Sequence, residues 1–209
     1  MFKRILAVLV LGLAAGHALA QSPVAVIESA VDELSAELDE RREELMNDPQ
    51  AMYKMIDDIL LPRFDRNYAA QLVLGRHWRT ASAEQRQQFI DAFYQVLLQR
   101  YADGVLEFEQ EKVEILPYRG DPTEKRTMVR TFVTLDDGTR VPINYALVQR
   151  DEGWQIFDVT VEGVSYVRNF RAEMNSEINA KGLAAVIERL ESETANDASG
   201  GDSASSDAE

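Results

Sequence analysis

The chain has 209 residues, of which 45% are hydrophobic and 28% charged, with no cysteine, two histidines and a formal net charge of -14. Without cysteine there is no disulfide scaffold, zinc–thiolate site, iron–sulfur cluster or thiol nucleophile, and the acidic balance disfavours binding to nucleic acid or to an anionic membrane surface. The apolar content is sufficient for a sizeable core in one large domain or two small ones.

The first 20 residues have the three parts of a secretory signal. Lys3 and Arg4 form a basic start, an apolar run follows from Ile5 to Ala15, and small residues precede Gln21. The apolar run is shorter than the ~20 residues that cross a bilayer. We therefore predict a signal peptide over residues 1–20, cleaved after Ala20, and an exported chain that is more acidic than its precursor.

Three helical segments are predicted after the leader. Ser22-Pro23 is an N-cap followed by proline in the first turn, and apolar residues then recur every three or four positions up to Asn47. A second, short helix begins at Gln50 and stops before Pro62. A third segment covers residues 63–74, with Gly75 as its left-handed cap.

The next helix carries an aromatic face. Ser82 and Gln85 have the spacing of a capping box, and Phe89, Phe93, Leu97 and Tyr101 follow at intervals of four residues. Core packing is the simpler interpretation of such a face, and a cofactor-binding site has little support.

From Val113 the hydrophobic period changes from 3.6 to 2. Alternating apolar residues predict strands around 113–115, 129–135, 141–149 and 154–161. The second and third are joined by Asp136-Asp137-Gly138, and the third and fourth by Asp151-Glu152-Gly153, both typical of tight turns. We expect an antiparallel sheet with one buried face, ending at Gly163.

Helical spacing returns after the sheet, with Ser165 as an N-cap, and a last short helix follows Gly182. Helices, a strand meander and further helices predict an α+β fold with helices on one face of the sheet. Residues 192–209 contain mostly Ser, Ala, Gly, Asp and Glu and no basic side chain, which predicts a disordered acidic tail. A single folded domain would then cover residues 22–191.

Few side chains are available for catalysis. His77 is the only histidine outside the leader, and Ser165 lacks the second glycine of a nucleophile elbow. The carboxylate pairs Asp57-Asp58 and Asp136-Asp137 are explained by a solvated helix surface and by a turn. No phosphate-binding loop or dinucleotide fingerprint is present. We predict a protein that is not an enzyme and has no catalytic residue, metal or cofactor.

Two blocks of motifs run in a fixed order over about 120 residues. The first block contains Leu61-Pro62-Arg63-Phe64-Asp65, Leu74-Gly75-Arg76-His77-Trp78, Ala83-Glu84-Gln85-Arg86, Phe89, Phe93 and Tyr101. The second contains Asn144-Tyr145-Ala146-Leu147, Gly153-Trp154-Gln155-Ile156-Phe157-Asp158-Val159, Val161-Glu162-Gly163-Val164-Ser165, Asn169-Phe170-Arg171 and Gly182. On these motifs the chain resembles the MlaC, or toluene-tolerance, family of periplasmic phospholipid-binding auxiliary proteins of the Mla ABC transport system.

The resemblance implies a carrier in the Gram-negative periplasm. It would shuttle phospholipid between an outer-membrane lipoprotein–porin complex and the inner-membrane Mla ABC transporter complex, and so maintain the lipid asymmetry of the outer membrane. It also implies an NTF2-like cone, in which a bent antiparallel sheet of four or five strands and the N- and C-terminal helices surround an apolar pocket. The strong negative charge, the acidic tail and Phe170, where a tyrosine is expected, depart from the family pattern.

Three alternatives remain open. The chain could carry a hopanoid or another apolar lipid, it could be a non-catalytic periplasmic adaptor with a closed core, or it could be an enzyme of a related open-sheet fold. An enzyme would need an acid or base in the cavity, whereas the predicted inner face is apolar. The pattern of apolar residues alone does not distinguish a pocket from a closed core.

The predicted lipid-binding residues come from one parity of the sheet and one face of the long helix. Tyr101 and Tyr145 are expected at the mouth, where an apolar ring and a polar hydroxyl suit both environments. Replacing Val141 or Ile143 by Asp is expected to reduce the amount of bound lipid. The full set is Phe93, Leu97, Tyr101, Val129, Val133, Val141, Ile143, Tyr145, Leu147, Val159 and Val161.

Overall fold

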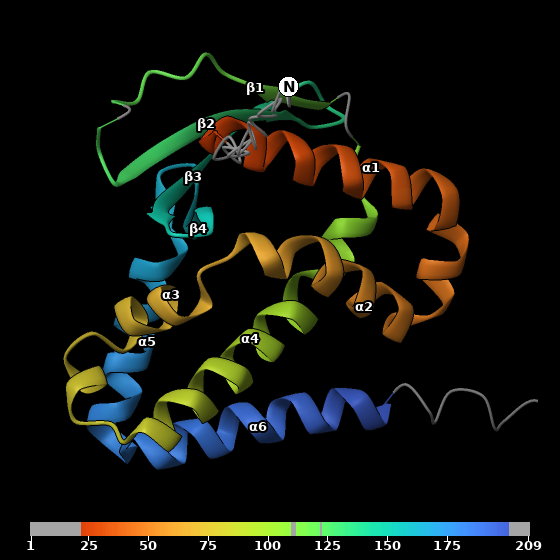
Figure 1. Cartoon of the computed structure of the whole chain (residues 1–209). Coiled ribbons are helices and arrows are strands. Elements are labelled where there is room, and N and C mark those ends of the chain that lie inside the picture. Colours follow the sequence, from red (N-terminus) through yellow and green to blue (C-terminus); the bar gives the residue numbers. More distant parts are fainter. Residues whose placement is uncertain (1–21, 110–111, 122, 201–209) are drawn as a thin grey trace, which may run out of the picture.

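The structure is a computed structural model that describes residues 22–109, 112–121 and 123–200. The predicted signal peptide over residues 1–20 lies outside this part. Helices, a strand meander and further helices follow one another along the chain (Figure 1), so the α+β class is confirmed. The elements are α1 (Pro23–Asn47), α2 (Pro49–Leu60), η1 (Leu61–Arg63), α3 (Arg66–Leu74), η2 (Gly75–Arg79), α4 (Ala83–Leu106), β1 (Val113–Ile115), β2 (Arg126–Thr134), β3 (Arg140–Arg150), β4 (Gly153–Val161), β5 (Val164–Ser165), α5 (Tyr166–Lys181) and α6 (Leu183–Gly200).

Several of the helices begin at side-chain caps. Ser22 Oγ accepts a hydrogen bond from Ala25 N at 3.1 Å, and Ser165 Oγ accepts one from Arg168 N at 3.1 Å. The predicted capping box at α4 is present: Ser82 Oγ accepts from Gln85 N at 3.1 Å, and Gln85 Oε1 accepts from Ser82 N at 3.0 Å. These contacts satisfy backbone N–H groups that a first helical turn otherwise leaves without partners.

The segment before Gly75 differs from the single helix predicted over residues 63–74. Pro62 lies in the short helix η1, and α3 begins only after Asp65, whose Oδ1 accepts a hydrogen bond from Tyr68 N at 2.9 Å. Gly75 ends α3 with φ +53°, and a Cβ there would lie 2.9 Å from Arg171 Nε. Glycine is thus favoured by the backbone conformation, and a larger residue would in addition displace the end of the Arg171 side chain.

The strands form one antiparallel sheet in the order β1-β2-β3-β4-β5. A β-bulge lies between β3 and β4, because Ala146 pairs with Asp158 and Leu147 pairs with Ile156, which leaves Phe157 as an extra residue. Such a bulge bends a strand and redirects its side chains. The sheet does not end at Gly163 as predicted, since Glu162 and Gly163, with φ of +50° and +83°, make a tight turn into β5.

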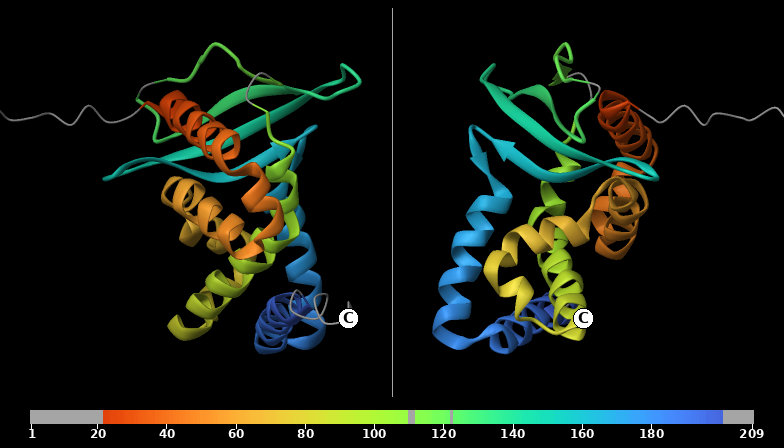
Figure 2. Two further views of the ribbon diagram at one scale, coloured as in Figure 1. Left: turned by 90° about the vertical axis from the view of Figure 1, so that its right-hand side faces the viewer. Right: turned by 60° about the vertical axis from the view of Figure 1, so that its left-hand side comes forward.

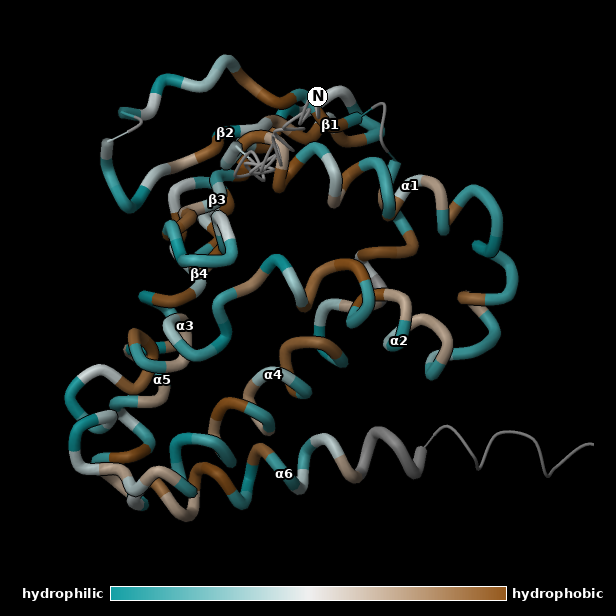
Figure 3. The backbone as a smooth tube through the Cα atoms, viewed as in Figure 1, coloured by the Kyte–Doolittle hydropathy of each residue, from teal (hydrophilic) through white to brown (hydrophobic). Residues whose placement is uncertain are grey.

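Helices lie against one side of the sheet and extend away from it. In the right-hand view of Figure 2, α4 and α5 run down from the sheet on opposite sides of α3. Along α4 and α6 the hydropathy alternates between apolar and polar residues (Figure 3), as helices with one buried face require. None of the described helices is long and apolar enough to cross a membrane.

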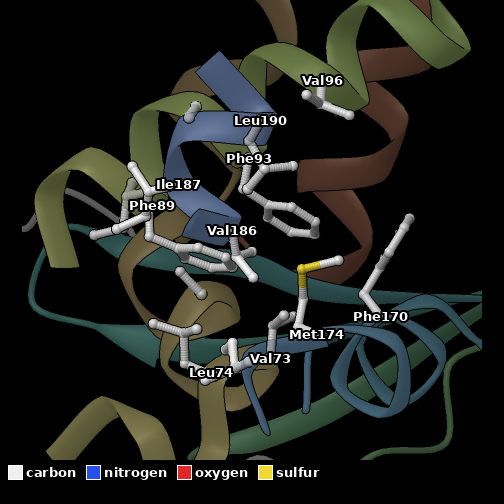
Figure 4. Packing of buried hydrophobic residues seen from close by; sticks show 14 residues of the cluster. Val73, Leu74, Phe89, Phe93, Val96, Phe170, Met174, Val186, Ile187 and Leu190 are labelled. Carbon is white, nitrogen blue, oxygen red and sulfur yellow. The ribbon is translucent and has the colours of Figure 1, made fainter. Parts of the chain in front are cut away.

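Three buried clusters hold these layers together. The first joins α3, α4, α5 and α6 around Phe89, Phe93 and Met174 (Figure 4). The second joins the C-terminal half of α1 to α2 and α4 around Leu38 and Met52. In the third, the N-terminal part of α1 packs on the sheet, and the buried residues are Val26, Ile27, Val129, Leu147 and Ile156.

The last helix continues through residues that were expected to be disordered. Helix α6 extends to Gly200, whereas the acidic tail was predicted to begin at Ser192. Glu193 forms ion pairs with Arg100 at 3.0 Å and with Arg189 at 2.8 Å, and Gln99 Nε2 donates to Thr194 O at 3.3 Å. The contacts of Glu193 and Thr194 with α4, which composition does not reveal, hold the start of this segment against the domain. Residues 201–209 lie outside the described part.

Candidate functional site

An apolar cavity of about 510 Å³ lies between the sheet and the helices. Strands β3 and β4 form one wall, and α2, α3, α4 and α5 form the others. This volume is within the range of small-molecule sites in proteins, which is roughly 300–1,000 Å³. The cavity answers the question that the sequence left open, because the apolar face of the sheet is only partly covered by core residues.

Seven of the eleven predicted residues line this cavity. The strand residues share a face because the rows Tyr145–Val159 and Ile143–Val161 are paired across β3 and β4. The residues on α4 reach the same space because they follow one another at helical spacing. The seven are Phe93, Leu97, Tyr101, Ile143, Tyr145, Val159 and Val161; their part in binding a ligand stays a prediction.

The other four predicted residues lie elsewhere, and their assignment to the pocket is corrected. Val129 and Leu147 are fully buried against α1, in the cluster that contains Val26 and Ile27. Val133 and Val141 pair with each other near the β2–β3 turn, outside the cavity wall. For Val129 and Leu147 the physical reason is that α1 covers this part of the sheet face. Val133 and Val141 lie at the turn end of β2 and β3, beyond the paired rows that line the cavity.

Most of the remaining wall was not predicted. Helical periodicity placed several of these residues on apolar faces but could not tell which helices meet below the sheet. Strand alternation did not assign Phe157 to the inner face of the sheet, because the β-bulge that turns this residue toward the cavity breaks the alternation. The additional residues are Ile56, Leu60, Phe64, Arg66, Ala69, Ala70, Val73, Ile90, Tyr94, Leu98, Ala102, Val105, Phe157, Asp158, Tyr166, Val167 and Phe170.

The two tyrosines predicted at the mouth have different positions. Tyr101 is 43% exposed, and its ring packs edge-on against Tyr166 at 5.5 Å between centroids, so it lies at the rim as expected. Tyr145 lies instead in the wall, between Val129 of β2 and Val159 of β4. Burial raises the pKa of the Tyr145 phenol, and a hydrogen bond with Thr131 partly opposes that effect.

An aromatic row connects the rim to the interior. Tyr166 packs against Phe170, and Phe170 packs edge-on against Phe93 at 5.1 Å. Phe170 is 5% exposed and belongs to the apolar cluster around Met174. A tyrosine hydroxyl at this position would need a buried hydrogen-bond partner, which explains why phenylalanine suits the site where the family pattern suggested tyrosine.

Among the described residues that line the cavity, two carry a formal charge, Arg66 and Asp158. Asp158 accepts hydrogen bonds from Ser165 Oγ at 2.6 Å and from Val167 N at 3.0 Å, and so fixes the start of α5 to β4. The Tyr94 hydroxyl donates to Asp57 Oδ1, and burial together with this bond raises the pKa of Tyr94. The polar groups of the wall are thus used mainly in holding its elements together.

The catalytic candidates considered from the sequence, which are His77, Ser165 and the two carboxylate pairs, do not belong to the cavity wall. His77 lies on η2, where its Nε2 is 3.1 Å from Asn175 Oδ1, and it does not belong to the cavity wall. Within the described residues, no group of three or more His, Asp or Glu side chains is placed to hold a metal ion. What the wall offers is a mostly hydrocarbon lining with one polar rim, which suits an apolar or amphipathic ligand.

Comparison with known proteins gives consistent results over most of the chain. The model of the family described as MlaC protein matches residues 28–192. The toluene tolerance protein ttg2D of Pseudomonas putida is 27% identical over 164 residues, which cover 78% of this chain and 76% of the relative. The intermembrane phospholipid transport system binding protein MlaC of Haemophilus influenzae is 22% identical over 173 residues, covering 81% of each chain.

A solved structure has the same fold. The phospholipid-binding protein from Ralstonia solanacearum, determined in complex with a phospholipid, superposes with a TM-score of 0.76 at 24% sequence identity. The match covers 85% of this chain and 97% of that protein. At this level of identity the likeness establishes the arrangement of helices and sheet.

Proposed function

This chain belongs to the MlaC protein family, and we propose that it carries phospholipid through the periplasm of a Gram-negative cell. The observation that carries the proposal is the cavity of about 510 Å³, whose lining is hydrocarbon apart from two charged side chains and a few tyrosine hydroxyls. Such a lining favours acyl chains, because burial of hydrocarbon away from water is favourable in proportion to its area. The phospholipid bound to the Ralstonia solanacearum protein of the same fold supports this choice of ligand.

The cost of exposing acyl chains to water explains why a carrier is needed. Two acyl chains contain about 30 methylene groups, and at roughly 0.8 kcal/mol each their exposure to water costs on the order of 25 kcal/mol. A phospholipid therefore does not cross an aqueous compartment unaided. Transfer from a bilayer to an apolar cavity is much closer to neutral, because both environments exclude water. Exchange can be fast once a partner opens the mouth.

The partners and location belong to the same proposal. The Haemophilus influenzae relative is an intermembrane transport component by name, which supports exchange with an outer-membrane lipoprotein–porin complex and with an inner-membrane Mla ABC transporter complex. The sequence contains no nucleotide-binding motif, so direction would come from those partners. We further propose that residues 1–20 direct export and are removed after Ala20, and that the protein acts by binding and not by catalysis.

The test is the content of the cavity in protein taken from a periplasmic fraction. Native mass spectrometry followed by lipid extraction should find phospholipid bound to a chain that begins at Gln21. A hopanoid or another apolar lipid in its place would favour the sister hypothesis of a different cargo. Protein that arrives without any lipid, and does not take up phospholipid from vesicles, would contradict the carrier function.

A further inference from the structure

The side chain of Arg66 differs from that of Asp158, the other charged residue of the cavity wall, because it makes no hydrogen bond to the residues that the structure describes. The carboxylate of Asp158 is satisfied by two donors. The nearest carboxylate oxygen to Arg66 is Asp91 Oδ1, at 3.9 Å from Nη1, and the guanidinium lies over the ring of Tyr94 at 5.0 Å from its centroid. Five N–H donors of Arg66 are therefore available at the edge of an apolar space.

The position of Arg66 is at the rim and not in the depth of the cavity. It is the first residue of α3, directly after the cap Asp65, and its side chain is 36% exposed. Tyr94 and Tyr101, seven residues apart on α4, are separated by about 10 Å along the helix axis. Tyr101 and Arg66, which lies over the Tyr94 ring, are thus two partly exposed residues of the cavity wall, at places along α4 where the hydrocarbon lining meets water.

A cation at such a boundary attracts the anionic group of a ligand. Next to low-dielectric walls its field is screened less than on an open surface. The planar guanidinium fork also matches the paired oxygens of a phosphate, to which it can donate two parallel hydrogen bonds. Asp91 keeps a hydrogen-bond donor when Arg66 turns away from it, because Asp91 Oδ2 accepts a hydrogen bond from Gln87 Nε2 at 2.9 Å.

We propose that Arg66 binds the phosphodiester of the lipid whose chains occupy the cavity. This residue then makes the carrier selective for phosphate-bearing lipids over neutral lipids with the same two chains. The inference rests on the proposed function, since it needs the chains in the cavity, but it adds the group that is recognised and the residue that recognises it. Asp91, whose Oδ1 lies 3.9 Å from Arg66 Nη1, competes with the phosphate for the guanidinium.

The experiment compares two soluble ligands that differ only in the head group. Dioctanoyl phosphatidylcholine and dioctanoylglycerol are titrated into the full exported chain after its own lipid has been removed. Arg66→Gln should weaken phosphatidylcholine binding by roughly tenfold to a hundredfold, as expected for a charge-assisted hydrogen-bonded pair, and should leave dioctanoylglycerol binding within about twofold. Asp91→Asn should tighten phosphatidylcholine binding, because it removes the competing carboxylate.

Matched controls separate this role from general effects of charge and folding. Arg79→Gln makes the same charge change on η2, outside the cavity wall, and should alter neither affinity. Inorganic phosphate should compete only weakly with phosphatidylcholine, since it brings no chains; strong competition would show a free-anion site and overturn the proposal. Equal losses for both ligands in Arg66→Gln would mean that Arg66 only holds the wall together. If the unmodified chain binds neither ligand, the carrier function itself fails.

Discussion

Ile143 and Val141 lie two positions apart on the same face of β3, yet their surroundings differ. Ile143 lines the cavity opposite Val161, whereas Val141 pairs with Val133 near the β2–β3 turn and does not belong to the wall. The difference arises because the elements below the sheet change along the strand. Alternation along β3 therefore identified the correct face of the strand, but it did not show which residues on that face border the cavity.

These two residues provide a matched test of the site. Ile143→Asp should reduce phospholipid co-purified with the protein on the order of tenfold, because a carboxylate facing acyl chains loses its hydration without gaining a partner. Val141→Asp, which makes the same change outside the cavity, should retain lipid. The measurement is the lipid-to-protein ratio after extraction, with circular dichroism to verify folding. If a folded Ile143→Asp variant contains as much lipid as the parent protein, this part of β3 does not belong to the site.

At the scale of elements, the wall depends on short polar contacts between neighbouring segments. Asp158 fixes the start of α5 to β4, and Glu177 of α5 is bound to Arg189 of α6 through two hydrogen bonds of 2.9 and 2.8 Å. Glu177 is 15% exposed. The pair orients α5, which carries Tyr166 and Phe170 of the cavity wall, so its strength bears on the shape of the site.

The hydrogen bonds with Arg189 hold the pKa of Glu177 below its ordinary value of 4.5. A lowered pKa means that the ionised form stabilises the folded state at neutral pH, and that this contribution is lost as the pH falls through the lowered value. Glu177→Gln should therefore reduce the free energy of unfolding by about 1–2 kcal/mol at neutral pH. The difference in free energy of unfolding between this variant and the parent should become smaller in the acidic range below pH 4.5.

Urea unfolding at several pH values measures this difference. Glu188→Gln, on the exposed side of α6, is the control and should follow the parent at every pH. If the difference in free energy of unfolding between Glu177→Gln and the parent stays constant into the acidic range, the carboxylate contributes by packing and not by its charge.

At the scale of the whole molecule, the site exists only because distant segments meet. Helix α2 contributes Ile56 and α5 contributes Phe170, more than a hundred positions later, to the same cavity. The molecule as a whole is strongly acidic, with a formal charge of -14 that includes the two basic residues of the leader. Such a charge opposes approach to anionic bilayers.

This charge predicts the salt dependence of lipid exchange. Exchange with phosphatidylglycerol vesicles should accelerate as salt rises, because the Debye length falls from about 10 Å at 0.1 M to about 3 Å at 1 M and repulsion is screened. Exchange with neutral phosphatidylcholine vesicles should change little. Transfer of a fluorescent phospholipid measures both rates. A rate that falls with salt on the anionic vesicles would instead point to a basic docking face on the protein.

The sequence by itself determined the elements and the chemical character of this protein. The caps at Ser22, Ser82 and Ser165 and the change of period at Val113 are local signals, since a cap or an alternation is encoded within a few residues. The motifs from Leu61 to Gly182 were enough to indicate the family. The apolar faces and the scarcity of histidine favoured burial of a ligand over catalysis.

Only the tertiary structure decided where a cavity exists. Val129 and Tyr145 are cross-strand neighbours on one face, and both are apolar in pattern, but α1 covers the first and the cavity borders the second. Phe157 and Arg66 became part of the wall through a β-bulge and through the docking of α3 against α4. Hydrophobic pattern reports that a side chain avoids water; whether protein or empty space lies against it depends on how distant elements pack, which no local spacing encodes.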